Sequence, residues 1–281
     1  MSPRRVITPR PIRPTPDRAI GLARLSSRSG RTSVALLLLL SVALSGSARA
    51  YRPFDATDAA VAEQGDIEME VGPVGFLKEG SGRFLIAPSL ILNWGLAADW
   101  ELVLEGRQFV QLGNSAPGRR WAVEDAALSL KHVLREGVLQ EKSGISIAAE
   151  MSALLPATDG EGGAGAELAL IASQRWDALT LHLNGAASWT RTHTPGMFAS
   201  LIAEGHDAWV VRPVAELFVE AERNAPTTIS GLFGAIWRLR ESFSIDAAVR
   251  LARAGPVSTT EIRAGFTWAF GIGFPTLRRK R

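Results

Sequence analysis

Apolar and polar residues alternate with a period of two along most of the chain beyond residue 65. In the stretch WELVLEGR (100–107), the apolar residues fall on one face, and Glu101, Glu105 and Arg107 fall on the other. Successive side chains of a strand point to opposite faces, so this period predicts β-strands rather than helices. The chain is therefore expected to be all-β.

Turn signals divide the alternating region into twelve expected strands. Most are 9–14 residues long, which exceeds the five or six residues usual in soluble sheets and suffices to cross a bilayer at a tilt. The expected strands are 66–77, 83–95, 100–112, 122–134, 143–155, 164–174, 179–191, 197–205, 209–222, 228–240, 243–253 and 259–270.

The connections alternate in character. Gly-, Pro- and polar-rich loops follow the odd-numbered strands at 78–82, 113–120, 156–163, 192–196, 223–227 and 254–258. Tight turns follow most even-numbered strands at 96–99, 175–178, 206–208 and 241–242, whereas the connection at 135–142 is longer. An even number of strands with short turns at one end is typical of a bacterial outer-membrane barrel. We therefore predict a single closed antiparallel transmembrane β-barrel over residues 66–274.

All eight tryptophans lie at or near expected strand ends. Indole rings favour membrane interfaces, and outer-membrane barrels carry aromatic girdles there. Six are expected at the tight-turn side (Trp94, Trp100, Trp176, Trp209, Trp237 and Trp268) and two at the other (Trp121 and Trp189). A soluble sandwich or lipocalin-like barrel shows the same alternation with the apolar face inside. Strand length, the even count and tryptophan placement favour the membrane.

The first fifty residues predict a cleaved secretory signal peptide. A basic region precedes a short, largely apolar stretch at 34–44 and an Ala-x-Ala box at 48–50. Eleven helical residues rise only about 17 Å, too short for a membrane anchor of roughly 20 residues. We expect a short periplasmic segment at 51–65 and a solvated basic tail at 275–281. With an even number of strands, both ends of the mature chain are expected in the periplasm.

Removal of residues 1–50 changes the charge balance. They hold nine arginines and one acidic residue, so the other 231 residues carry 22 basic and 27 acidic residues. A net charge of −5 gives no support to a nucleic-acid partner. The chain has no cysteine, and its four histidines show no metal-ligand spacing, so neither a disulfide framework, a metal nor a cofactor is expected.

Charged residues on the inward face are the candidate functional residues. Two interpretations remain open: cross-strand ion pairs that fill a narrow interior, or a hydrated path for a small solute. Asp246 and Arg250 lie on the strand next to that of Glu261 and Arg263, so opposite charges of the two strands can pair across the ladder. The candidate lumen-lining residues are Glu101, Glu105, Arg107, Arg212, Glu216, Asp246, Arg250, Glu261 and Arg263.

Catalytic motifs are scarce. His182, Asn184 and Ser188 share one face of one expected strand, which invites comparison with the twelve-stranded outer-membrane phospholipase. That family has its histidine and serine two residues apart. Here six residues separate them, roughly 20 Å along a strand, so hydrogen bonding is out of reach. We therefore expect no enzyme activity.

The C-terminal third resembles the outer-membrane β-barrel family named for the MetA pathway of phenol degradation, also described as a transporter family. The resemblance is carried by GLFGAIW (231–237), FSIDAAVR (243–250) and EIRAGFTWAF (261–270), with RPFD (52–55) near the start. Ala248 stands where the family often has glycine. The resemblance implies an outer-membrane barrel and the passage of small molecules, and it identifies no substrate.

Together these features predict a passive outer-membrane channel or transporter for small solutes, and the name of the resembled family suggests apolar or aromatic ones. The alternative is a structural or interaction barrel with a plugged lumen. The expected partners are outer-membrane lipid, the small-molecule solute and, during biogenesis, the outer-membrane barrel assembly machinery.

Overall fold

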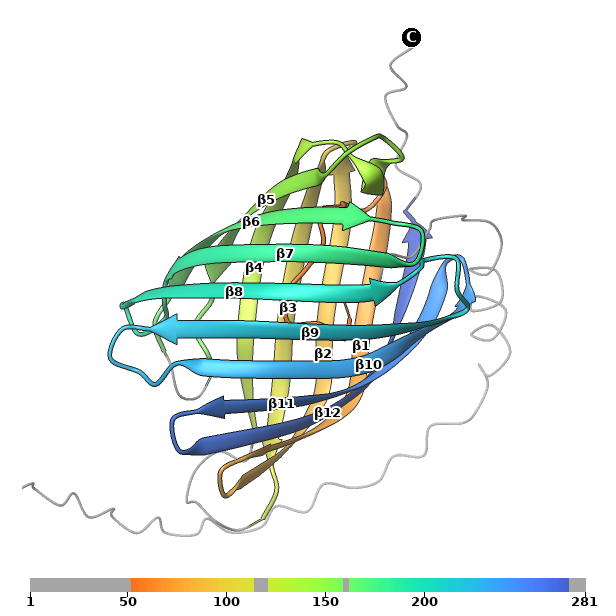
Figure 1. Cartoon of the computed structure of the whole chain (residues 1–281). Coiled ribbons are helices and arrows are strands. Elements are labelled where there is room, and N and C mark those ends of the chain that lie inside the picture. The colour runs from red at the N-terminus through yellow and green to blue at the C-terminus, as the bar shows by residue number, and fades with distance from the viewer. Residues whose placement is uncertain (1–51, 114–120, 159–161, 273–281) are drawn as a thin grey trace, which may run out of the picture. The chain divides into compact units, whose positions relative to one another are not determined.

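The computed structural model describes residues 52–113, 121–158 and 162–272, in which twelve strands form a closed antiparallel barrel (Figure 1). Each strand pairs with the next along the chain, and β12 closes the barrel on β1, with Asp66 opposite Gly271. The strands are β1 (Asp66–Glu79), β2 (Gly82–Ala97), β3 (Trp100–Gln111), β4 (Trp121–Arg135), β5 (Ser146–Leu154), β6 (Gly165–Arg175), β7 (Leu179–Trp189), β8 (Pro195–Gly205), β9 (Val211–Glu222), β10 (Thr228–Arg240), β11 (Phe243–Ala254) and β12 (Val257–Gly271).

The predicted fold class and all twelve strands are confirmed, with ends displaced by three residues or fewer. The expected signal peptide at 1–50 and the tail at 275–281 lie outside the described residues. One three-residue 3-10 helix, η1 (Val138–Gln140), is present in the described part of the chain. No helix there is long and apolar enough to cross a membrane.

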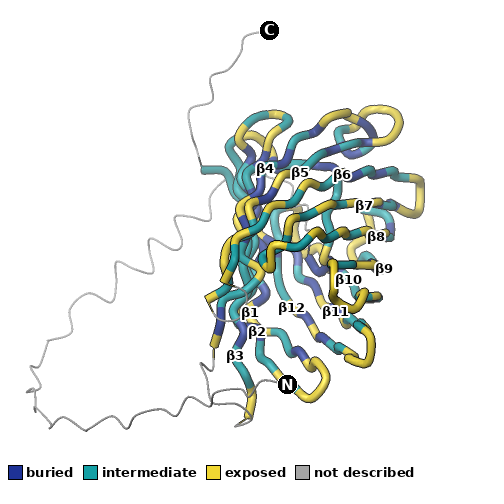
Figure 2. The backbone as a smooth tube through the Cα atoms, turned by 90° about the vertical axis from the view of Figure 1, so that its left-hand side faces the viewer, coloured by how far each residue is buried: buried dark blue, intermediate teal, exposed yellow. Residues whose placement is uncertain are grey.

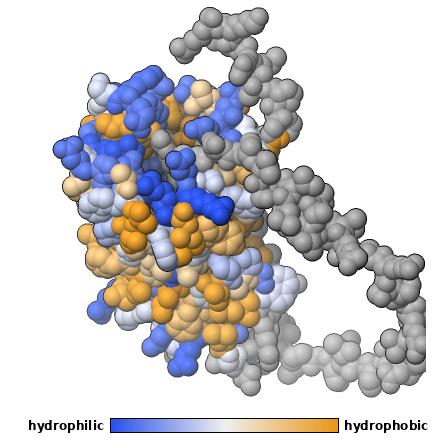
Figure 3. All heavy atoms as spheres, turned by 90° about the vertical axis from the view of Figure 1, so that its right-hand side faces the viewer, coloured by the Kyte–Doolittle hydropathy of each residue, from blue (hydrophilic) through white to orange (hydrophobic). Residues whose placement is uncertain are grey.

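The barrel wall is polar inside and apolar outside. Glu70 and Glu101 are fully buried, whereas Leu104 is 45% and Phe233 64% exposed. Buried and exposed residues alternate along the strands in Figure 2. Hydrophobic residues cover much of the barrel side seen in Figure 3, and hydrophilic residues gather towards its upper end. This pattern inverts that of a soluble barrel, so the outer surface suits lipid.

The tryptophans lie at strand ends, as predicted, and face outwards. Trp100, Trp121, Trp176, Trp189, Trp209, Trp237 and Trp268 are between 38% and 53% exposed, and Trp94 is partly buried. Trp100 also stacks on His132, with ring centroids 4.0 Å apart. Their placement provides two bands of amphipathic rings on the outer surface.

The two ends of the barrel differ less in loop length than the sequence predicts. We call the end where β1 begins and β12 ends the terminal end. At the other end, β1–β2 and β11–β12 join through two-residue turns, because the strands extend further than expected. Gly80 (φ 54°) and Gly255 (φ 56°) supply the left-handed backbone that such tight turns require.

Two prolines lie inside neighbouring strands, Pro73 on β1 and Pro88 on β2, and each coincides with an interruption of strand pairing. Pro73 lies at the irregularity between Val71 and Val74 in the pairing of β1 with β12. Pro88 lies at the register shift between Ile86 and Ser89 in the pairing of β2 with β3. A proline cannot donate a ladder hydrogen bond, so both are tolerated at bulges. The resulting irregular patch of wall lies beside Ser89, a contact of the N-terminal segment described below.

The long β4–β5 connection turns inwards at the terminal end. It contains η1, in which Leu139 is buried. Leu139 clusters with Ala59 and Ala60, and Gln140 Nε2 donates to Ala59 O at 2.9 Å. The connection is long because it contacts a segment inside the barrel.

Candidate functional site: the barrel lumen and its N-terminal segment

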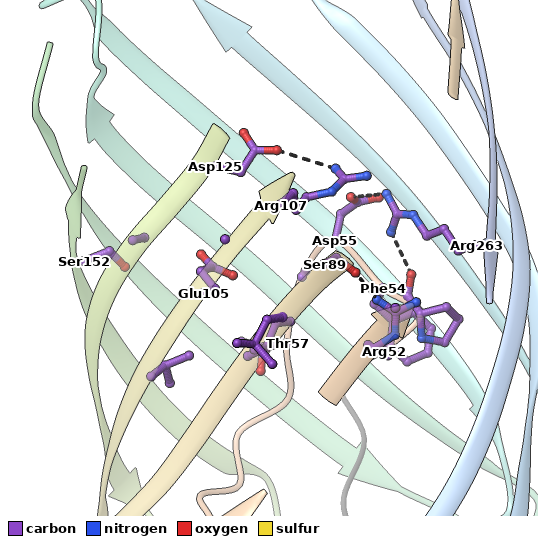
Figure 4. Close-up of a pocket in the computed structure, with 18 of the residues that line it drawn as sticks. Arg52, Phe54, Asp55, Thr57, Ser89, Glu105, Arg107, Asp125, Ser152 and Arg263 are labelled. Carbon is purple, nitrogen blue, oxygen red and sulfur yellow. Dashed lines mark hydrogen bonds and ion pairs between the residues drawn. The ribbon is translucent and has the colours of Figure 1, made fainter. Parts of the chain in front are cut away.

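The residues that precede β1 lie inside the barrel. We call residues 52–64 the N-terminal segment; the sequence analysis expected a periplasmic segment at 51–65. Figure 1 shows it within the ring of strands, and Figure 4 shows its first residues at closer range. It forms hydrogen bonds with side chains of nine of the twelve strands: Glu70, Ser89, Glu101, Lys131, Ser173, Asn184, Glu216, Asp246 and Arg263. The segment therefore crosses the lumen.

Acceptors on the wall satisfy the backbone of this segment. Glu216 accepts from the N–H of Asp55 at 2.8 Å and of Ala56 at 3.0 Å. Glu101 accepts from the N–H of Ala62 at 2.6 Å, and Glu70 accepts from that of Arg52 at 2.8 Å. Buried backbone donors need partners, and a segment outside any sheet must find them in side chains. Several inward carboxylates thus hold the segment.

Arg52, the first residue of the N-terminal segment, anchors it to the barrel wall. Its Nε lies 3.4 Å from Asp246 Oδ2, and its Nη1 donates to Ser89 Oγ at 2.8 Å. A Cβ at Gly72 or Gly265 would collide with the Arg52 side chain. The two glycines therefore leave the space in the wall that the guanidinium occupies.

Arg263 forms the second anchor. Its Nη1 donates to Pro53 O at 2.7 Å, and its Nη2 donates to Asp55 Oδ1 at 2.6 Å, as Figure 4 shows. Its Nε donates to Glu261 at 2.9 Å. Glu261 also pairs with Arg107 and, at 2.9 Å, with Arg250. The Glu261 carboxylate thus joins two further arginines, Arg107 and Arg250, to the anchor Arg263.

The middle of the segment is held by polar contacts. Lys131, which is 1% exposed, donates to Thr57 Oγ1 at 3.1 Å and lies 3.7 Å from Asp58. Asn184 Nδ2 donates to Thr57 O at 2.9 Å. A buried ammonium group needs such partners, because desolvation of an unpaired charge is costly.

Apolar contacts complete the fit. Phe54 is 9% exposed and packs with Ile202, Val214, Leu232 and Ile236 on the inner wall. Burying an aromatic side chain contributes about 1.5–3 kcal/mol. The segment therefore has an apolar as well as a polar attachment.

A cavity of about 490 Å³ lies beside the segment; we call it the vestibule. Residues 52–57 line one part of it, and the lining reaches Asp125 and Arg191, on the side away from the terminal end. Of the nine candidate lumen-lining residues, six line the vestibule: Glu101, Glu105, Arg107, Arg250, Glu261 and Arg263. In Figure 4, Glu105 points into this space.

The other three candidates face inwards outside the vestibule lining. Glu216 and Asp246 contact the segment, and Arg212 Nη2 lies 3.5 Å from Glu204. Of the charges expected to pair across the β11–β12 ladder, Arg250 and Glu261 do pair, at 2.9 Å, and Glu261 also contacts Arg263 along its own strand. Asp246 pairs with Arg52, because the N-terminal segment supplies an arginine that strand pairing alone does not provide.

A buried polar row on β6–β8 escaped the sequence analysis. Ser173 Oγ lies 2.8 Å from His182 Nδ1, and His182 Nε2 lies 3.3 Å from Glu204. Ser173 Oγ also accepts from Ala59 N–H at 3.0 Å and is fully buried. The hydroxyl thus contacts the segment. Ser173 and His182 are cross-strand partners, which one-strand spacing does not reveal. No metal-ligating cluster of three or more side chains occurs in the described ranges.

The architecture defines a β-barrel of the outer-membrane type. No protein-family model matches the sequence, and neither does any curated protein. An outer-membrane channel from Pseudomonas putida F1 has a TM-score of 0.58 at 13% identity, with 77% of this chain and 100% of that chain covered. The NanC porin gives 0.52 at 8% identity (72% and 98% covered). The KdgM porin, in complex with oligogalacturonate, gives 0.50 at 12% (73% and 99%). These likenesses establish the fold, and the family named from the closing hairpin stays a prediction.

Proposed function

We propose that the protein is a passive channel of the bacterial outer membrane for small solutes, with the N-terminal segment as a movable closure. The observation that carries the proposal is the vestibule: a polar cavity of about 490 Å³ inside a barrel whose outer surface is apolar. Exposed leucine and phenylalanine side chains favour lipid, and an inward charged lining favours water and polar solutes.

Polar groups around the segment support movement rather than a permanent plug. The inner-wall atoms Ser200 Oγ, Ser230 Oγ and Thr267 Oγ1 are buried without a hydrogen-bond partner among the described residues. Leaving a buried polar group unpaired costs about 1–3 kcal/mol. Water that enters the lumen when the segment moves would satisfy those of these groups that it reaches. In the closed form, the contacts of Arg52 and Arg263 therefore offset the cost of these unpaired polar groups, and opening would remove that cost.

A charged vestibule favours polar solutes over the apolar or aromatic solutes that the family name suggests. Transfer of an apolar solute into this lining would strip water from many charged groups, which is unfavourable. We further propose insertion by the outer-membrane barrel assembly machinery, with the terminal end in the periplasm, following the rule for such barrels.

The alternative is a structural or interaction barrel with a fixed plug, and the extensive anchoring of the N-terminal segment favours it. Swelling of liposomes that contain the refolded chain from residue 51 separates the two. A channel admits a small sugar or amino acid and swells the vesicles, whereas a fixed plug does not.

A variant without residues 52–62 provides the control. If only this variant supports swelling, the barrel is folded and its lumen is open without the segment, so the protein is a barrel with a fixed plug. If neither protein supports swelling while both are folded by heat-modifiable gel mobility, the channel proposal is wrong.

A further inference from the structure

The vestibule carries an excess of negative charge. Its lining contains eight carboxylates and five guanidinium groups. Four of the five arginines are engaged in ion pairs: Arg52 with Asp246, Arg107 with Asp125 and Glu261, and Arg250 and Arg263 with Glu261 and Asp55. By contrast, Glu105, Glu150, Glu167 and Glu220 make no hydrogen bond or ion pair within the described part of the chain. These four carry the excess.

The fifth arginine does not neutralise them. Arg191 donates from Nε to Leu155 O at 2.7 Å and from Nη2 to Ala126 O at 2.8 Å. Arg191 attracts Glu105 and Glu167 through space but forms no ion pair with either carboxylate in the described residues. All four carboxylates line the same cavity, and like charges gathered in one cavity repel one another. A cation in the vestibule would relieve this repulsion.

A second feature of the lining independently calls for a hydrogen-bond donor. Asn93 is fully buried and lines the vestibule. Its Nδ2 donates to Glu70 Oε1 at 2.9 Å, and this bond fixes the orientation of the amide. Its Oδ1 has no hydrogen-bond partner in the residues that the structure describes. A buried amide oxygen without a donor suits a ligand that carries N–H or polarised C–H groups.

The same cavity has an aromatic wall. The Phe198 and Phe218 rings lie 5.2 Å apart, and both residues line the vestibule. Phe198 is directly opposite Glu220 in the β8–β9 ladder. An aromatic ring and a carboxylate therefore lie side by side. Both attract cations, and the ring also contacts an apolar body.

We propose that the vestibule selects small organic cations. The cationic head would lie near Glu105, Glu167 and Glu220, and the apolar body would lie on Phe198 and Phe218. The cavity has the volume of a small-molecule site. This inference rests on the proposed function for its part in transport, and it names the solute class of that same path.

Flux and electrical measurements test selectivity. Benzyltrimethylammonium and benzenesulfonate are aromatic ions of similar size and opposite permanent charge. We expect liposomes containing the full chain from residue 51 to take up the cation at least about tenfold faster, since a cleft of one sign concentrates counter-ions. The reversal potential in a potassium chloride gradient should have the sign of a cation-selective pore.

The matched variants separate vestibule charge from total charge. Glu105→Gln/Glu167→Gln/Glu220→Gln should remove most of the preference. Glu241→Gln, a neutralisation at the exposed β10–β11 turn, should leave it unchanged. Flux of both ions at equal rates, or a triple variant with unchanged preference, would overturn the inference while the channel function stands.

Equilibrium binding tests the site even if no flux is found. In detergent-refolded protein, titration calorimetry should detect benzyltrimethylammonium, with binding weakened at least about tenfold in the triple variant. Benzyl alcohol and benzenesulfonate should not bind measurably. If potassium competes as well as the organic cation, the site is one for inorganic cations and the proposed class is wrong. Absence of cation binding to folded protein also overturns it.

Discussion

Arg263 on the last strand donates a 2.6 Å hydrogen bond to Asp55, which lies 208 positions earlier and inside the barrel. The same guanidinium donates to Pro53 O at 2.7 Å. The closing strand and the beginning of the described chain are therefore joined in the lumen. This anchor holds the N-terminal segment to the inner wall of the barrel.

Weakening this anchor should favour the open form. Asp55→Asn removes the charge that faces Arg263 but leaves Arg263 paired with Glu261. A hydrogen bond to a charged group contributes about 1.5–3 kcal/mol, so the open population should rise by roughly tenfold or more. Single-channel recording in planar bilayers measures it. Asp177→Asn, in the exposed β6–β7 turn, is the control. An unchanged open fraction in Asp55→Asn would show that the anchor does not govern closure.

Filling the space beside Arg52 should have a similar effect without a change of charge. The atoms nearest to a Cβ at Gly72 would be the Ser89 hydroxyl and, at 2.7 and 2.9 Å, the Arg52 guanidinium nitrogens, so Gly72→Ala should displace the guanidinium. At Gly185, a Cβ meets nothing within 4 Å, which makes Gly185→Ala the matched control. We expect faster cleavage of the N-terminal segment by added protease in Gly72→Ala alone. Equal protection in both variants would contradict the role given to Arg52.

The inside–outside assignment predicts opposite outcomes at neighbouring positions. Leu104 is 45% exposed on the outer face, so Leu104→Arg should cost roughly 2–4 kcal/mol if it lies near the bilayer midplane. Leu102→Arg, on the same face, should behave alike. Glu105→Arg points into the vestibule and should fold normally, with ion selectivity shifted towards anions. Heat-modifiable gel mobility compares the three. Misfolding of Glu105→Arg with normal folding of Leu104→Arg would reverse the assignment.

The exposed tryptophans predict contact with lipid. Seven of the eight are 38–53% exposed on the outer surface. In liposomes made with lipids brominated on the upper part of the acyl chains, intrinsic fluorescence should fall to less than about half of that in unbrominated lipid, because indole rings lie near the interface. Emission that is unaffected by bromine in correctly folded protein would argue for a barrel outside the bilayer.

The strands could be predicted from sequence because the pleat imposes its period locally. Glu101, Glu105 and Arg107 reveal their face by spacing alone, and six of the nine candidate residues indeed line the vestibule. Each strand needs only its own residues and its turns to be recognised. The cross-strand pair Arg250–Glu261 follows from the same register.

The position of the N-terminal segment could not be predicted in this way. Residues 52–64 lack a period, and their hydrogen-bonding partners are distributed over nine strands, from Glu70 on β1 to Arg263 on β12. One indirect signal was present: the β4–β5 connection was longer than its counterparts, and its Leu139 and Gln140 contact Ala59 and its neighbour Ala60. The cross-strand pair Ser173–His182 was missed because a single strand does not show which residue lies opposite.

A reversible tether tests most directly whether solute passes when the N-terminal segment moves. Ala59 N–H donates to Ser173 Oγ at 3.0 Å, and the chain has no cysteine of its own, so Ala59→Cys/Ser173→Cys introduces one defined disulfide between the segment and the wall. Liposome flux and bilayer conductance are measured on the same preparation before and after reduction. The oxidised protein should be closed, and reduction should restore flux to the level of the reduced single variants. Equal flux in the oxidised and reduced double variant, with the disulfide verified by mass, would show that the path does not depend on the segment and would contradict the account.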